Sequence, residues 1–421
     1  MLQMNDWLNM VVDMPEMKSG QELISALSVF PEYDEVIRNE SPAVRLMALS
    51  DLYRLYIPSQ MSLEIYSKLY LALLRSMQKK EMQIAVKQKY ENHKAIQGQE
   101  YRGIIGGSDS FTIIGTSGIG KSSAIMRAID LIMENKVIEV ENPYTKITPC
   151  VIVQCPFDSS VKGLLLEILR KVDEIIDSNY YQYALKSRAT TDMLIGSVSQ
   201  VALNHIGLLV VDEIQNVVNS KNGKSLIGAL TQLINNSGIS IGMVGTPECI
   251  PFFEQAMQLA RRSVGLQYSN MPYDAYFESF CKVVFEYQYI QRKSEITPVI
   301  TEWLYEHSVG VVSVVVSLIH DAQEIAILTG QEVLNLETLN QAYKQRLSLL
   351  HGYIQPTIIH TGQTTKPKKR VSSASMTGAT GEKTNINSQK SLADLVSQAK
   401  AENRDIVSLL KENYVVVEVS V

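Results

Sequence analysis

The sequence predicts an α/β fold in which a parallel sheet is flanked by helices. Between residues 105 and 290, short β-branched runs alternate with segments of helical pattern, which is typical of strands joined by crossover helices. Each run is almost entirely apolar, as expected of strands that are covered on both faces. The four runs are residues 111–114, 151–154, 208–211 and 239–244.

The composition is that of a globular protein. The chain has 421 residues, of which 45% are apolar and 20% charged, and this length favours two or three domains. A mainly disordered chain, a collagen-like repeat and a disulfide scaffold are excluded. The four cysteines form no CxxC pair, so we expect buried free thiols and no zinc site. Because the net charge is −5, any contact with nucleic acid needs a local basic patch.

The pattern along the chain divides it into four regions. We expect a helical N-terminal region at 1–98, an α/β core at 99–292, a helical lid at 293–355 and a flexible tail at 356–421. Residues 63–82 have the apolar spacing of an amphipathic helix. The lid segment reads as three helices, including residues 311–316, with Gly330 ending one helix and Asn335 capping the next. The tail is rich in Ser and Thr, carries KPKKR at 366–370, and ends in an amphipathic segment.

No segment is predicted to cross a membrane. The most apolar stretch, residues 310–319, is far shorter than the roughly 20 residues that a bilayer requires. Asp6 and Asp13 interrupt the first apolar residues, and no basic segment precedes these, so the beginning of the chain does not resemble a secretory signal. We therefore expect a cytoplasmic location.

A glycine-rich loop at 115–122 reads GTSGIGKS and fits the phosphate-binding pattern GxxxxGK[ST]. A predicted strand precedes it and a helix at 123–133 follows, which is the setting that this motif requires. Its glycines let backbone N–H groups surround a polyphosphate, and the helix adds its positive end. Lys121 is expected to bind the β- and γ-phosphates, and Ser122 to bind Mg²⁺. The predicted nucleotide contacts are Gly115, Thr116, Ser117, Gly118, Ile119, Gly120, Lys121, Ser122 and Ser123.

A pair of acidic residues, Asp212 and Glu213, follows the predicted strand at 208–211. Residues 206–216 read IGLLVVDEIQN, and a carboxylate at the end of a buried strand needs a compensating charge. We expect Asp212 to share Mg²⁺ with Ser122. Glu213 is then placed to act as the general base toward the attacking water.

Two further elements fit hydrolysis. Thr246 follows the strand at 239–244, where its hydroxyl can sense the γ-phosphate or orient the water. Arg261 and Arg262 are candidates for an arginine finger that reaches the site of a neighbouring subunit; a solvated pair or DNA contacts are the alternative. No NKxD-type guanine-reading sequence is present, so ATP is favoured over GTP.

Together these motifs resemble those of AAA+ ATPases. More narrowly, GTSGIGKSSAI, LLVVDEIQNV, IGMVGTPE and LARR resemble the TnsC/TniB family of transposition regulators, over roughly residues 100–350. The resemblance implies a Walker A motif at 115–122, a Walker B pair at Asp212 and Glu213, a first sensor at Thr246, and a trans-acting Arg261 or Arg262. It also implies cooperative, ATP-dependent assembly of rings or filaments on duplex DNA.

The same resemblance implies partners. Such proteins connect a target-selecting protein to transposase subunits, and ATP hydrolysis regulates target choice. The resemblance implies DNA-facing residues between the second and third core strands, where Lys186 and Arg188 are the candidate DNA contacts. The N-terminal region is expected to dock the target selector and the tail to dock the transposase, although KPKKR also fits a solvated linker. The lid turn at 308–316 lacks the arginine common in AAA+ lids, which favours a slow, switch-like ATPase.

Two other functions fit the motifs. One is a replication loader or initiator of AAA+ build; the presence of only a linker and one predicted helix after residue 350 argues against an initiator. The other is a signalling scaffold that uses nucleotide as a switch and does not bind DNA. Salt-sensitive, ATP-dependent duplex binding separates the transposition regulator from the scaffold.

Overall fold

The computed structural model describes residues 14–80, 90, 93–94, 97, 110–133, 137–141, 144–218, 220–255 and 265–346. The chain divides into two compact units, Met1–Ile359 and His360–Val421, and every described residue belongs to the first. The predicted tail, its KPKKR sequence and its terminal amphipathic segment therefore lie outside the described residues.

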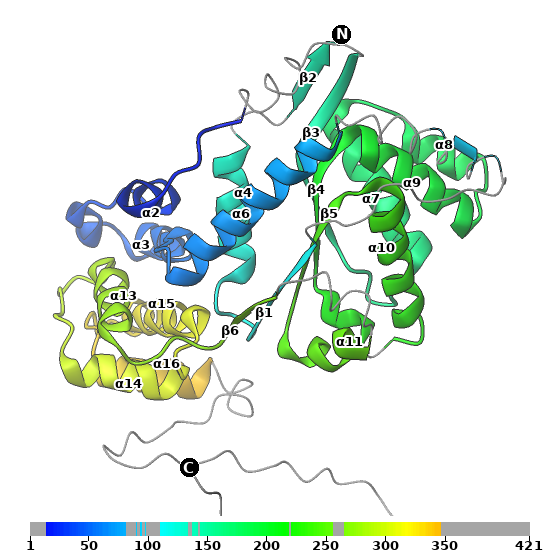
Figure 1. Cartoon of the computed structure of the whole chain (residues 1–421). Coiled ribbons are helices and arrows are strands. Elements are labelled where there is room, and N and C mark those ends of the chain that lie inside the picture. The colour runs from blue at the N-terminus through cyan, green and yellow to red at the C-terminus, as the bar shows by residue number, and fades with distance from the viewer. Residues whose placement is uncertain are drawn as a thin grey trace, which may run out of the picture. The chain divides into compact units, whose positions relative to one another are not determined.

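The core is a six-stranded, mostly parallel sheet of order β2-β3-β4-β5-β1-β6 (Figure 1). The four predicted strands are confirmed, and the hairpin pair β2–β3 is the one antiparallel pair in the described sheet. Neither β2 nor β6 was predicted. In β2 (IEVE) glutamates alternate with apolar residues, and β6 has only three residues, so neither strand contains an apolar run. The strands are β1 (Phe111–Gly115), β2 (Ile138–Glu141), β3 (Tyr144–Gln154), β4 (Ile206–Asp212), β5 (Ser240–Gly245) and β6 (Leu266–Tyr268).

Helices cover both faces of this sheet. Strand β4 shows why its sequence is apolar throughout: Leu209 and Val211 enter one core, whereas Leu208 and Val210 enter the other. One face is covered by α7 (Val161–Ile176), α9 (Thr191–His205) and α10 (Gly223–Ser237), with the short α8 (Tyr180–Lys186) beside α7. The other face is covered by α2 (Gly20–Leu27), α4 (Gln60–Lys80) and α6 (Lys121–Ile132). A further helix, α11 (Ile250–Gln255), follows β5.

The lid is helical and has its own core. The three helices predicted for it are confirmed, and α13 (Ala275–Glu286) precedes them. Gly330 ends α15 with a left-handed φ of +72°, and the Asn335 side chain accepts hydrogen bonds from the N–H groups of Glu337 and Thr338, both at 3.0 Å. The predicted helix end and cap are therefore confirmed. The three helices are α14 (Pro298–Ser308), α15 (Val312–Thr329) and α16 (Leu336–Gln345).

The N-terminal helices divide between these two cores. Helix α4 confirms the amphipathic helix predicted from residue 63 and packs on the sheet together with α2. The 3₁₀ turn η2 (Leu49–Arg54) instead places Leu49 and Leu52 in the lid core. Beside it lie α3 (Pro42–Ala48) and the 3₁₀ turn η1 (Glu35–Asn39).

A buried ion pair fastens α3 to the lid. The Arg45 side chain, 1% exposed, donates two hydrogen bonds of 2.7 Å to the carboxylate of Glu332. It also donates to the backbone oxygens of Glu40 and Tyr289, at 3.1 and 3.0 Å. The chain between η2 and α4 therefore runs from a lid-bound segment to a sheet-bound helix.

The cysteines and the apolar lid helix are both buried. Cys150, Cys155, Cys249 and Cys281 are free and buried, as predicted. Helix α15 is long and apolar enough to pass a length-and-composition test for a membrane span. Its apolar side chains lie in the lid core, and the core helix of a globular domain passes the same test.

Candidate nucleotide site

The glycine-rich loop connects β1 directly to α6. Gly118 and Gly120 have left-handed φ values of +81° and +95°, which glycine adopts at little cost. Helix α6 begins at Lys121, so its positive N-terminal end faces the loop. The strand–loop–helix setting predicted for the phosphate-binding motif is present.

The next polar groups come from the neighbouring strand ends. Because β5 lies between β4 and β1, the carboxyl ends of these strands bring Asp212, Thr246 and the glycine-rich loop to one edge of the sheet. They line a cavity of about 240 Å³ together with Ser117, Ser122, Ser123, Gln215 and Ser313.

The candidate metal ligands are already adjacent. The Ser122 hydroxyl donates a hydrogen bond of 3.0 Å to Asp212 Oδ2, and the N–H of Glu213 donates one of 2.8 Å to Asp212 Oδ1. One hydroxyl and one carboxylate suit Mg²⁺, which binds few protein oxygens and completes its shell with phosphate and water. This donor set fits the predicted cofactor.

Lys121 lies folded into the loop. Its Nζ donates to the backbone oxygens of Gly115 and Thr116, at 2.7 and 2.9 Å. Burial lowers the pKa of Lys121, and the nearby carboxylates of Asp212 and Glu213 oppose this shift. A bound triphosphate would add negative charge at this point and favour the protonated ammonium.

Glu213 is held in a strained conformation by a residue that the sequence analysis did not select. Its φ is +58°, in the left-handed region that is costly for a residue with a Cβ atom. The Gln215 Nε2 donates to the Glu213 carboxylate. In the sequence, Gln215 is marked only by its place in the DEIQN motif. A glutamine two residues after an acidic residue predicts no contact until the turn between them is known.

Two buried oxygens at this cavity favour a polar ligand. Gln215 Oε1 and Thr246 Oγ1 have no hydrogen-bond partner among the described residues, and both residues line the cavity. A buried polar atom without a partner costs about 1–3 kcal/mol. Polar atoms of a bound nucleotide or of its attacking water can supply partners in this cavity, so these residues fit the predicted ligand.

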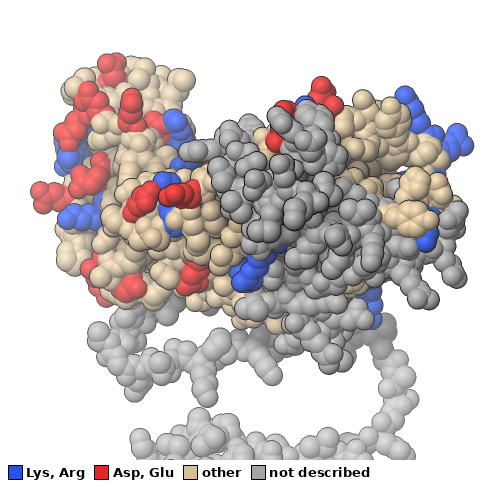
Figure 2. All heavy atoms as spheres, turned by 45° about the horizontal axis from the view of Figure 1, so that its top comes forward, with Lys and Arg blue, Asp and Glu red and all other residues tan. Residues whose placement is uncertain are grey.

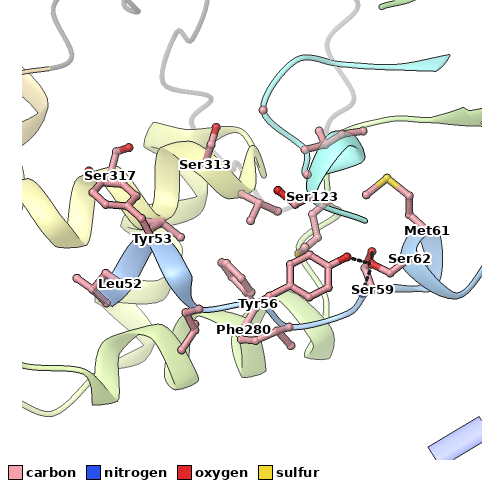
Figure 3. A pocket seen from close by; sticks show the side chains of 18 of the residues that line it. Leu52, Tyr53, Tyr56, Ser59, Met61, Ser62, Ser123, Phe280, Ser313 and Ser317 are labelled. Carbon is pink, nitrogen blue, oxygen red and sulfur yellow. Dashed lines mark hydrogen bonds between the residues drawn. The ribbon is translucent and has the colours of Figure 1, made fainter. Parts of the chain in front are cut away.

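A second cavity of about 210 Å³ adjoins the first and shares Gly118, Gly120, Ser123 and Ser313 with it. Tyr53 and Tyr56 from the N-terminal segment line this space together with Phe280 and Ser317 of the lid (Figure 3). The Tyr56 hydroxyl lies 2.8 Å from Ser62 Oγ. Aromatic and apolar walls with a few polar groups suit a planar base. These residues were not predicted, because only tertiary packing brings them beside the loop.

The lid touches the loop through α15. The Ser313 N–H donates to the Gly118 oxygen at 3.1 Å, and a Cβ atom on Gly118 would lie 2.4 Å from Ser313 Oγ. Ser313 belongs to the lid segment whose sequence lacks the arginine expected of many AAA+ lids. A neutral hydroxyl therefore faces the phosphate cavity from this segment.

The other predicted site residues lie elsewhere. Arg261 and Arg262 fall outside the described residues. Lys186, at the end of α8, and Arg188 are exposed and do not line either nucleotide cavity. All other predicted contacts belong to the glycine-rich loop or the two strand ends described above.

The fold and this site define a P-loop nucleotide-binding core. Residues 106–269 match the family model described as bacterial TniB protein. This match bears out, for the core of the chain, the resemblance to the TniB family seen in the motifs.

Solved structures give more distant likenesses. The Orc1 protein of Aeropyrum pernix in complex with DNA aligns with 62% of this chain and 63% of its own, at 13% identity and a TM-score of 0.41. Drosophila ORC bound to DNA aligns with 78% of this chain and 69% of its own, at 12% identity and a TM-score of 0.37. This chain thus spans less than two thirds of the Orc1 chain. No curated protein matches the sequence.

Proposed function

We propose that this protein is an ATP-dependent, DNA-binding regulator of transposition that oligomerises on duplex target DNA and connects a target-selection protein to a transposase. The convergence of Lys121, Ser122, Asp212, Glu213 and Thr246 on one cavity carries the proposal. This set can hold MgATP and activate a water. The match of residues 106–269 to the TniB family supports the link to transposition.

Each site residue has a proposed role. Lys121 neutralises the β- and γ-phosphates, and Ser122 and Asp212 hold Mg²⁺. Glu213 accepts the proton of the attacking water, and Thr246 orients that water. Arg261 or Arg262 stabilises the charge that develops on the γ-phosphate in the site of a neighbouring subunit, which would make hydrolysis depend on assembly.

A neutral lid residue supports a slow, switch-like ATPase. Ser313, from the lid segment that lacks an arginine, lines the phosphate cavity. Duplex DNA and a self-assembled ring or filament are the proposed partners, with the target selector at the N-terminal region and the transposase at the tail. A cytoplasmic location fits this role.

Local charge is the basis for the proposed DNA contact. The net charge of −5 disfavours binding by the whole molecule, and acidic and basic side chains are interspersed on the face drawn in Figure 2. The proposed contact must therefore come from a patch, for which exposed Lys186 and Arg188 are candidates.

The test is the ATPase rate of the purified full chain with and without duplex DNA, alongside DNA binding in ATP and in ADP. We expect slow turnover that DNA accelerates, and binding that needs ATP. Fast turnover without DNA would contradict a switch. Hydrolysis without DNA binding in either nucleotide would favour the nucleotide-switch scaffold.

A further inference from the structure

A single aromatic side chain protrudes from the carboxyl edge of the sheet. Phe157 follows β3 and is 90% exposed, the highest value among the large apolar residues that the structure describes. Exposing a phenylalanine ring to water is unfavourable by roughly 2 kcal/mol compared with burying it. Its burial against a partner would therefore contribute binding energy.

The loop that carries Phe157 is held in place by hydrogen bonds. The Asp158 backbone oxygen accepts bonds from Ser220 Oγ at 2.8 Å and from Asn222 Nδ2 at 3.1 Å. The Asp158 carboxylate accepts one from the Ser160 N–H at 3.0 Å. The ring is thus presented by an ordered loop, which lowers the entropic cost of binding.

Basic residues surround this loop. The Lys162 Nζ donates to the Ala189 oxygen at 3.4 Å, which places the turn at 186–190 beside the start of α7. The contacts of Asp158 place the segment at 220–224 beside the same loop. Within 156–162, 186–192 and 220–224 the chain carries five cations and two carboxylates, all exposed. The cations are Lys162, Lys186, Arg188, Lys221 and Lys224.

We propose that this Phe157 surface (Phe157 with these five cations) binds duplex DNA, with the cations on backbone phosphates and the phenyl ring inserted as an apolar wedge at the minor groove. Cations on phosphates fix position without reading sequence, and an inserted apolar side chain adds contact by partly unstacking a base step. The inference rests on the proposed function and adds residues and a binding mode to it.

The Phe157 surface is connected to the nucleotide site. The Ser159 hydroxyl donates to the Asn216 oxygen at 3.2 Å, and Asn216 Nδ2 donates to the Cys155 oxygen at 2.9 Å. Asn216 lies in the same turn, η3 (Ile214–Val217), that follows Glu213. A change in that turn on nucleotide binding would therefore shift the loop that carries Phe157, which gives a physical route for ATP-dependent DNA binding.

The test measures equilibrium binding of the ATP-bound full chain to a fluorescent 30-base-pair duplex over a salt series. We expect Phe157→Ala to weaken binding about tenfold and Phe157→Leu, which retains an apolar wedge, to lose much less. Phe30→Ala, at a phenylalanine that is 56% exposed on the N-terminal segment, should have no effect.

The same series tests the cations. Lys221→Ala should reduce the slope of log affinity against log salt by about 0.9, as expected for one lost phosphate contact. Lys344→Ala, at an exposed lysine of α16, should leave the slope unchanged. Nucleotide binding and the melting temperature should be unchanged in all variants, since none of these side chains lines the nucleotide cavities.

The outcomes separate this inference from the proposed function. If the wild type binds DNA and the Phe157→Ala and Lys221→Ala variants bind with the same affinity and salt slope, the Phe157 surface is wrong while the function stands. That result would also follow if the surface binds an acidic protein instead. If the wild type binds no DNA in any nucleotide state, both proposals fail.

Discussion

Three side chains of the phosphate cavity perform separable tasks at the residue scale. Lys121 supplies charge, Asp212 lies beside the Ser122 hydroxyl, and Glu213 faces the cavity from a strained turn. In the proposed mechanism, ATP binding depends on the charge of Lys121, whereas hydrolysis depends on the basicity of Glu213. Substitutions can therefore separate the two steps.

We predict that Glu213→Gln binds ATP with unchanged affinity and hydrolyses it about 100-fold more slowly, because the amide cannot accept the proton from water. Lys121→Ala should instead weaken ATP binding about tenfold or more. Titration with a fluorescent ATP analogue and a phosphate-release assay measure the two effects. Equal hydrolysis by Glu213→Gln and wild type would rule out Glu213 as the base.

Gln215 is predicted to position Glu213. Gln215→Ala should lower kcat about 10- to 100-fold with little change in KM, because a misdirected base affects the reaction more than substrate binding. Gln200→Ala is the matched control, since Gln200 also carries a buried unpartnered Oε1 but lines a pocket between α8 and α9. A rise in KM with unchanged kcat would assign Gln215 to binding.

At the scale of elements, the buried Arg45–Glu332 pair joins α3 to the loop between α15 and α16. Removing one partner leaves a buried charge without compensation, which typically costs about 3–5 kcal/mol. We predict that Arg45→Met lowers the free energy of unfolding by about 3 kcal/mol, and that adding Glu332→Leu recovers part of the loss. Urea denaturation of the single and double variants measures both values. Full additivity of the two substitutions would show that the pair is not coupled.

The same pair predicts a pH dependence. The hydrogen bonds from Arg45 hold the pKa of Glu332 below its ordinary value of 4.5. The folded state therefore gains stability from the ionised carboxylate above about pH 4.5, and this gain is lost as the pH falls through the lower folded value. Melting temperatures measured from pH 6 to pH 3 should fall less steeply for Glu332→Gln than for the wild type. Parallel curves would contradict this assignment.

How much the sequence predicts also depends on the element. The strands β1, β4 and β5 and the glycine-rich loop follow from local patterns, because a doubly covered strand must be apolar and a phosphate loop must be rich in glycine. In strand β2, glutamates alternate with apolar residues, and the strand lies at the edge of the sheet. Its pairing with β3 is visible only in the folded chain.

The site shows the same division. Each of the two Walker motifs is a short contiguous stretch of sequence, so its residues were predicted from the motif alone. Tyr53, Tyr56 and Ser313 come from segments far apart in the chain, and they meet only because η2 packs on the lid while α4 packs on the sheet. Phe157 also gave no signal, since a single phenylalanine after a strand predicts a buried ring rather than one that is 90% exposed.

At the scale of the whole molecule, the N-terminal segment packs on both the sheet and the lid, and the cavity proposed for the base lies beside it. The base cavity is bounded by the N-terminal segment, the glycine-rich loop and the lid. The Phe157 surface is tied by hydrogen bonds to the turn after Glu213. Nucleotide binding and DNA binding are therefore expected to favour the same arrangement, which makes assembly on DNA depend on ATP.

The most direct test of this account is duplex DNA binding at fixed salt with ATP, ADP and a non-hydrolysable ATP analogue, viewed by negative-stain electron microscopy. We predict rings or filaments on DNA in the two triphosphate states and none in ADP, with Glu213→Gln forming the most persistent assemblies in ATP. The absence of DNA binding in every nucleotide state, even at low salt, would contradict the account and leave a P-loop ATPase that acts as a switch without DNA.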